Sequence, residues 1–64
     1  MAEFYVEIVA QGNGDHTVHK SDCSILPSKE SIYYLGAISN SDSALKKARE
    51  RFKQVNACIH CSRP

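Results

Sequence analysis

Three cysteines and three histidines are the residues of this sequence with the most specific chemistry. Three residues separate His19 from Cys23, and two separate Cys58 from Cys61. Thiolate sulfur and imidazole nitrogen are the ligands of structural zinc sites, and four of them in two close pairs suit a tetrahedral ion. The spacing therefore predicts a structural Cys3His zinc site made of His19, Cys23, Cys58 and Cys61.

The histidine ligand is less firmly indicated than the cysteines. His16 and His19 both lie on one predicted strand, and residues three apart on a strand point to opposite faces. Only one of them should face the metal, and His19 is the nearer to Cys23 in the sequence. His60 lies inside the C-terminal Cys-x-x-Cys motif, where its side chain is expected to point outward. We take His19 as the ligand and keep His16 and His60 as alternatives.

The cysteines could have two other roles. A Cys-x-x-Cys motif can be a redox pair, but a thioredoxin-like pair opens a helix in a longer βαβ fold, and here the motif follows the predicted helix. Free cysteines are also often inert core residues. The histidine at a matching spacing beside a Ser-Asp turn favours a metal over either alternative.

Length and composition support a structural metal. The chain has 64 residues, 42% of them hydrophobic, and no tryptophan. We expect residues 1–64 to form a single zinc-binding domain, and domains this small often need a metal, a disulfide or a partner subunit to remain folded. A net charge of +1 excludes a uniformly basic nucleic-acid binder. The apolar runs are too short for a membrane span, and the first residues do not resemble a signal peptide, so we expect a cytoplasmic protein that does not enter a membrane.

Strand patterns occupy the first half of the chain. In residues 3–10, alternate positions are apolar, which predicts a strand with one buried face. Asn13-Gly14 predicts a hairpin turn, and residues 16–20 form the returning strand. Residues 32–38 are a third strand, in which Gly36 marks a bulge or bend. The buried face of the first strand should carry Phe4, Val6, Ile8 and Ala10.

A helix is predicted over residues 41–55. Its apolar residues recur at helical spacing, Ser39 and Asp42 resemble a weak capping box, and Asn56 suits the C-terminal cap. The stripe consists of Leu45, Ala48, Phe52 and Val55. The expected class is therefore α+β, a small antiparallel sheet of about three strands with one helix, stabilised by zinc.

These motifs together resemble the Ada-type small zinc-binding domains. The resemblance spans roughly residues 15–64 and is carried by His19-Lys20-Ser21-Asp22-Cys23, by Ser43-Ala44 opening a helix, and by Cys58-Ile59-His60-Cys61-Ser62-Arg63-Pro64. In that family a hairpin supplies a first ligand pair and a C-terminal Cys-x-x-Cys supplies the second. The DNA-repair member uses four cysteines, one of which accepts a methyl group. Here the first ligand position is His19, so the resemblance implies a zinc fold more strongly than methyl transfer.

Basic residues on the predicted helix suggest a partner. Lys46, Arg49 and Lys53 recur at helical spacing and form a stripe beside the apolar one. Such a stripe can contact phosphates, although a simply solvated helix face has the same appearance. We expect a nucleic-acid-binding module with Lys46, Arg49 and Lys53 as the contact residues.

The alternative is a protein-interaction module. It would use the exposed sheet face around Tyr5, Glu7 and Tyr33; of the adjacent Tyr33 and Tyr34, one is expected in the core. The sequence shows no nucleophile–base pair, paired carboxylates or phosphate-binding glycine loop. We therefore expect a non-enzymatic monomer.

Overall fold

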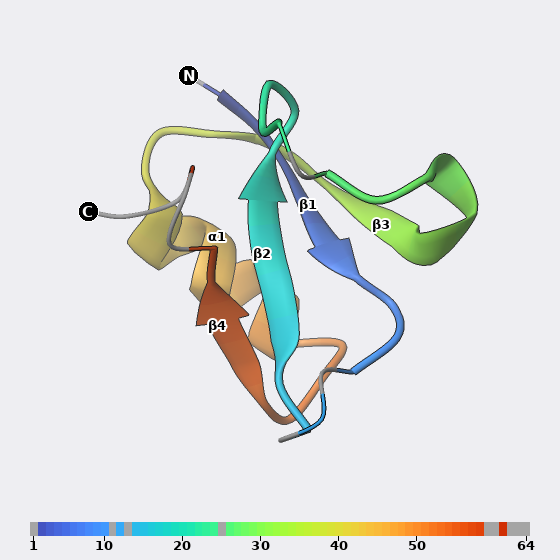
Figure 1. Cartoon of the computed structure of the whole chain (residues 1–64). Helices are drawn as coiled ribbons and strands as arrows, with labels where there is room; N and C mark the ends of the chain where they lie inside the picture. Colours follow the sequence, from blue (N-terminus) through green and yellow to red (C-terminus); the bar gives the residue numbers. More distant parts are fainter. Residues whose placement is uncertain (1, 11, 13, 25, 59–60, 62–64) are drawn as a thin grey trace.

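The structure is a computed structural model that describes residues 2–10, 12, 14–24, 26–58 and 61. It is an α+β arrangement of one helix and a four-stranded mixed sheet (Figure 1). The elements in chain order are β1 (Ala2–Glu7), β2 (His16–Lys20), the short 3-10 helix η1 (Lys29–Ser31), β3 (Ile32–Ile38), α1 (Ser41–Arg49) and β4 (Val55–Ala57).

The sheet has the strand order β3-β1-β2-β4. β1 pairs antiparallel with both β2 and β3, as the sequence predicts. β4 was not predicted, and it pairs parallel with β2, with His16 opposite Val55 and Val18 opposite Ala57. The predicted antiparallel sheet of about three strands is thus corrected to a mixed sheet with a parallel fourth strand.

The first strand is shorter than its apolar alternation. Phe4 and Val6 are buried, whereas Ile8 and Ala10, expected on the same face, are exposed. β1 ends at Glu7, and the Ile8 N–H donates to the carbonyl oxygen of Ser31 at 2.8 Å. This bond follows directly after Glu7–Ile32, the last residue pair between β1 and β3. Ile8 and Ala10 therefore lie beyond the part of the sheet that packs against the core.

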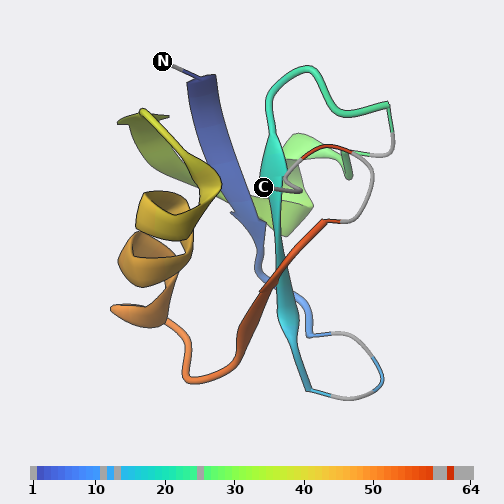
Figure 2. The same cartoon turned by 90° about the vertical axis from the view of Figure 1, so that its left-hand side faces the viewer.

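The hydrophobic core lies between the sheet and α1. α1 packs over one face of the sheet, while the turn after β2 lies on the other side (Figure 2). Phe4, Val6 and Val18 supply the strand side of this core and Ala44 and Ala48 the helix side. Its buried members are Phe4, Val6, Val18, Leu35, Ala44 and Ala48, flanked by Ala2, Ile38, Leu45, Phe52 and Val55.

The helix is shorter than predicted. α1 ends at Arg49 with Glu50 as its C-cap, and the predicted last helix residue Val55 and the predicted C-cap Asn56 belong to β4 instead. Cys58 has to lie beside β2, so the chain must leave the helix layer before it, and the extended residues of β4 provide that route. With nine residues in α1, no helix in the described ranges is long and apolar enough to cross a bilayer.

The helix begins at Ser41, as predicted, but its N-cap lies one residue after the predicted one. Asn40 is the N-cap, and its side-chain oxygen accepts a hydrogen bond from the Ser43 N–H at 2.8 Å. An Asn side chain satisfies one of the unpaired N–H groups of the first turn as well as a serine would. The Ser39–Asp42 capping box is therefore replaced by a single Asn cap.

The predicted irregularity at Gly36 is a β-bulge. The register between β1 and β3 shifts between Phe4 and Tyr5, which pair with Gly36 and Tyr34, and Gly36 has a φ of 117°. L-residues rarely adopt this conformation. The extra residue in the bulge is Leu35, which is buried in the core.

Replacing Gly36 tests this bulge. A Cβ at Gly36 would meet no atom within 4 Å, so Gly36→Ala should destabilise the fold through backbone strain alone, by about 1–3 kcal/mol. Urea unfolding monitored by circular dichroism measures the change. Gly12→Ala is the matched control, because Gly12 has open space and no positive φ, and it should change stability much less. Equal effects for the two variants would contradict the assigned bulge.

Candidate metal centre

Four predicted ligands converge in the structure. His19, Cys23, Cys58 and Cys61 each offer one ligand atom, and these four atoms all lie within 4.8 Å of one another. The Nδ1 atom of His19 lies 3.6 Å from the Cys23 sulfur and 3.9 Å from the Cys61 sulfur. The Cys23 and Cys58 sulfurs are 3.9 Å apart, which is almost twice a disulfide bond length of about 2.05 Å. The group is thus arranged to chelate one metal ion.

Backbone hydrogen bonds bring the ligands together. After His19 at the end of β2, the chain turns so that the Cys23 N–H donates to the Lys20 carbonyl oxygen at 3.1 Å. This turn brings the Cys23 sulfur back to His19, four positions earlier in the chain. Cys58 follows β4 directly, and its N–H donates to the Val18 carbonyl oxygen at 2.9 Å, which extends the β2–β4 pairing to the ligand.

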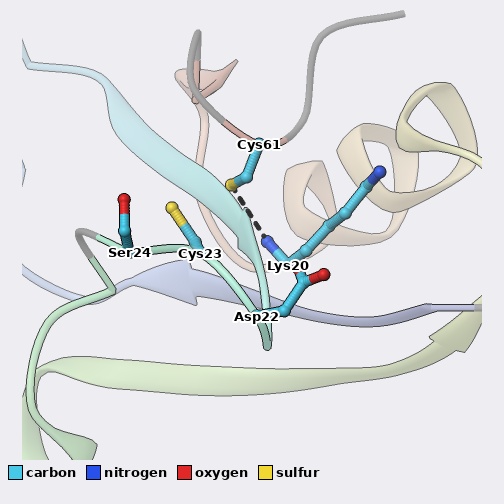
Figure 3. A pocket seen from close by; sticks show the side chains of 5 residues that line it. All are labelled: Lys20, Asp22, Cys23, Ser24 and Cys61. Atoms are coloured by element: carbon cyan, nitrogen blue, oxygen red, sulfur yellow. Dashed lines mark hydrogen bonds between the residues drawn. The ribbon is translucent and has the colours of Figure 1, made fainter.

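The Cys61 sulfur is also fixed by the backbone. The Lys20 N–H donates to it at 3.3 Å, so β2 contacts both members of the C-terminal cysteine pair. Hydrogen bonds from amides to a thiolate offset part of its negative charge. The Lys20 ammonium does not add to this effect, because its side chain extends away from the sulfurs (Figure 3).

The four ligands differ in their exposure. His19 is 1% exposed and Cys58 3% exposed, whereas Cys23 and Cys61 are only partly buried. Cys23 and Cys61 line a pocket of about 330 Å³ together with Lys20, Asp22 and Ser24 (Figure 3). The cluster therefore has a closed side, toward β2 and β4, and a polar side that is open to solvent.

Glu7 contacts the histidine of this cluster, a contact that the sequence did not predict. Its Oε2 atom lies 2.6 Å from the Nε2 atom of His19, and both side chains are largely buried, at 15% and 2% exposed. Because Nδ1 of His19 faces the sulfurs, Nε2 is the nitrogen that donates its proton to the carboxylate. Second-sphere carboxylates of this kind fix the ring orientation and tautomer of a metal-binding histidine.

The alternation of side chains along the first strand gave partial information about Glu7. Tyr5 pairs with His19 across β1 and β2, and Glu7 lies two residues further along β1, on the same face of the sheet. That placement depends on the register of the hairpin. Composition and spacing do not determine the register, so the contact could not be identified without the fold.

The donor set suits zinc. Three thiolates and one imidazole form a complete tetrahedral set, with soft sulfur ligands that select for zinc over hard cations such as magnesium or calcium. The closed side excludes bulk water from His19 and Cys58. A site with four protein ligands leaves no coordination position for a substrate, which distinguishes structural from catalytic zinc.

The alternative histidine ligands differ in what the structure describes. His16 stacks on Phe52, with ring centroids 4.0 Å apart, and its Nδ1–H donates to the Glu7 carbonyl oxygen at 2.8 Å. His16 takes no part in the metal-binding group. His60 and the Arg63-Pro64 ending lie outside the described residues.

The predicted basic stripe is not a single helix face. Lys46 and Arg49 lie on α1, but Lys53 lies beyond the helix end, in the segment before β4. All three side chains lie outside the core. The guanidinium of Arg51, in the same segment, stacks on the Tyr33 ring, with its carbon 4.3 Å from the ring centroid.

The tyrosines are distributed differently from the prediction. Tyr33 and Tyr34 are both exposed, at 37% and 50%, so neither is a core residue. Tyr34 pairs with Tyr5 on one face of the sheet, with ring centroids 5.2 Å apart, whereas Tyr33 pairs with Val6 on the helix side. Tyr5 and Tyr33 thus lie on opposite faces of the sheet, and the Glu7 carboxylate contacts His19. The predicted protein-binding surface of Tyr5, Glu7 and Tyr33 is therefore wrong.

Comparisons with known proteins add no family. No protein-family model matches the chain, and neither curated proteins nor solved structures provide a match.

Glu7→Gln is the sharpest test of the second-sphere contact. Losing the carboxylate charge next to Nε2 should weaken metal binding by about 10–100-fold, the usual effect of such partners. A competition titration against a chromophoric zinc chelator measures this change. Glu3→Gln is the matched control, because Glu3 is exposed on the same strand, and it should leave the affinity unchanged. Equal affinities of Glu7→Gln and the unmodified protein would contradict the role of Glu7.

Proposed function

We propose that this chain is a zinc-stabilised, non-catalytic binding module. The observation that carries the proposal is the convergence of His19, Cys23, Cys58 and Cys61 within 4.8 Å. These residues come from two segments that are far apart in the sequence, so one ion would join the first hairpin to the segment that follows β4. A complete set of protein ligands is what a structural ion requires and a catalytic ion does not.

The small size of the hydrophobic core is the reason that an ion would contribute much of the stability. Among the residues that the structure describes, six apolar residues form the buried core cluster. Structural zinc contributes about 10–16 kcal/mol of apparent binding free energy in zinc-finger peptides. The whole stability of a typical domain is about 5–15 kcal/mol. In this proposal the fold of the chain therefore depends on zinc.

Chelation tests the dependence on zinc. Protein purified without chelator should contain one zinc per chain, and removing it with EDTA should abolish the dispersion of amide signals in the NMR spectrum. Restoring zinc should restore the dispersion, because the free energy of zinc binding stabilises the folded state. Native-like dispersion in metal-free protein, with the metal content verified, would contradict a structural role.

Nucleic acid is the partner that we propose for this module. With a net charge of +1, any affinity for phosphates must come from a local patch. Lys46, Lys47 and Arg49 are exposed on the last turns of α1, and Arg51 and Lys53 follow it directly. Cations at a helix C-terminus also complement its dipole, so the patch has a structural role beside this function.

The stacked pair of Arg51 and Tyr33 supports the same partner. The Arg51 guanidinium lies over the face of the Tyr33 ring, and both residues are exposed beside the basic segment. Together with Leu35, Lys47 and Glu50 they line a hollow of about 220 Å³. Aromatic rings and guanidinium planes beside cations are the features on which single-stranded nucleic acids stack.

The basic residues provide the second test. Each phosphate contact contributes a slope of about −0.9 to the dependence of log affinity on log salt for a duplex, so three contacts predict about −2.7. Replacing Lys46, Arg49 and Lys53 together by Glu should abolish binding without unfolding the domain, because none of them belongs to the core. Titrations of labelled single- and double-stranded DNA and RNA with the zinc-loaded protein measure the effect.

A protein partner is favoured by a different surface. Tyr5, Tyr34, Leu26 and Pro27 contribute to an apolar hollow of about 350 Å³ on the face of the sheet that α1 does not cover. If no amide of α1 or residues 50–54 shifts with nucleic acid at low salt, the basic segment is a solvated surface. The protein-interaction function then becomes the better hypothesis.

A further inference from the structure

We propose that the polar pocket beside the metal cluster is a site of oxidative modification. In it, hydrogen peroxide oxidises Cys23, Cys58 completes a disulfide, and zinc is released. This proposal rests on the proposed zinc site and adds a reaction to it. It assigns different roles to the cysteines, according to their burial and to the distances between their sulfur atoms.

Access to the sulfur atoms is unequal. Cys58 is 3% exposed, whereas Cys23 is partly exposed and lines the pocket of about 330 Å³ (Figure 3). The other lining residues are Lys20, Asp22, Ser24 and Cys61, so the pocket has polar walls. Hydrogen peroxide, which is small and forms hydrogen bonds as water does, can therefore reach Cys23 without any movement of the core.

The second cysteine lies directly behind the first. The Cys58 sulfur is 3.9 Å from the Cys23 sulfur, and a disulfide requires about 2.05 Å. Cys23 lies in the turn that follows β2, outside the strand ladders, while Cys58 is tied to Val18 by its backbone N–H. A movement of about 2 Å by the Cys23 side chain and its turn thus forms the bond and leaves the β2–β4 pairing in place.

The reaction balances with peroxide as the oxidant. Metal-bound cysteine is already a thiolate, the nucleophilic form. The Cys23 sulfur attacks one peroxide oxygen, the O–O bond breaks, and hydroxide leaves, which gives a sulfenic acid. The Cys58 thiolate then attacks that sulfur, the S–S bond forms, and a second hydroxide leaves. Two electrons pass from the two sulfurs to the peroxide, and two protons from solvent convert the hydroxides to water.

Loss of these two thiolates removes half of the ligand set. Only His19 and Cys61 remain, and two ligands do not hold a structural zinc ion against free chelators. The disulfide replaces the ion as a link between the turn after β2 and the end of β4. Thiol reductant together with zinc should reverse the change, because sulfenic acid and disulfide are the reversible oxidation states of cysteine.

Peroxide titration of the zinc-loaded protein tests the proposal. A chromophoric chelator that does not extract zinc from the untreated protein reports its release, and peptide mapping by mass spectrometry identifies the disulfide. We expect one zinc released for each disulfide formed, with Cys23 joined to Cys58. A Cys58–Cys61 disulfide, or zinc release without any disulfide, would overturn the proposal.

Two histidine substitutions separate the roles of the pocket cysteines. Cys23→His removes the attacked thiolate but keeps four zinc ligands, so the variant should bind zinc and fail to release it during the time that empties the wild type. Cys61→His removes the other pocket cysteine and should release zinc as the wild type does. Equal release from both variants would overturn the assignment, and the wild-type disulfide map decides it if a variant does not fold.

The same samples distinguish this proposal from the proposed function. A wild-type protein that holds zinc but resists peroxide, or that is modified first at Cys58, retains the structural zinc function and loses the modification site. A wild-type protein that holds no zinc overturns both proposals.

Discussion

The position of His19 is the constraint on which the rest of the structure depends. Side chains alternate along β2, so burying Val18 under α1 places His19 on the opposite face of the sheet. Its ring there has two neighbours: Nε2 contacts Glu7 and Nδ1 faces the cysteine sulfurs. One residue therefore joins the sheet, a buried carboxylate and the proposed ion. The C-terminal cysteines have to reach this face, which determines the route of the chain after α1.

Local patterns in the sequence predicted most of the strands and the ligand set. β2 and β3 have the predicted bounds, because their β-branched and aromatic residues lie next to clear turn residues. The bulge at Gly36 was also indicated, since only glycine readily adopts its φ of 117°. The four residues that cluster could be identified because two close pairs of Cys and His residues are the spacing that a single ion requires.

The errors concern residues whose structure is set by distant parts of the chain. Val55 continues the helical spacing of Leu45, Ala48 and Phe52, yet it lies in β4, because pairing with His16 and the route to Cys58 outweigh local periodicity. Residues 50–54 contain no glycine or proline, so nothing in the local sequence marks the end of α1. The contact of Glu7 with His19 likewise depends on the hairpin register.

β4 connects the two halves of the proposed function. It pairs with β2, packs against α1 and leads directly into Cys58. The basic segment that contains Arg51 and Lys53 lies between α1 and this strand. A metal ion that held Cys58 and Cys61 against β2 would therefore also hold the end of β4 in place and, through this three-residue strand, the orientation of the basic segment. The proposed metal site and the proposed partner surface lie on different faces of the sheet, and β4 couples them.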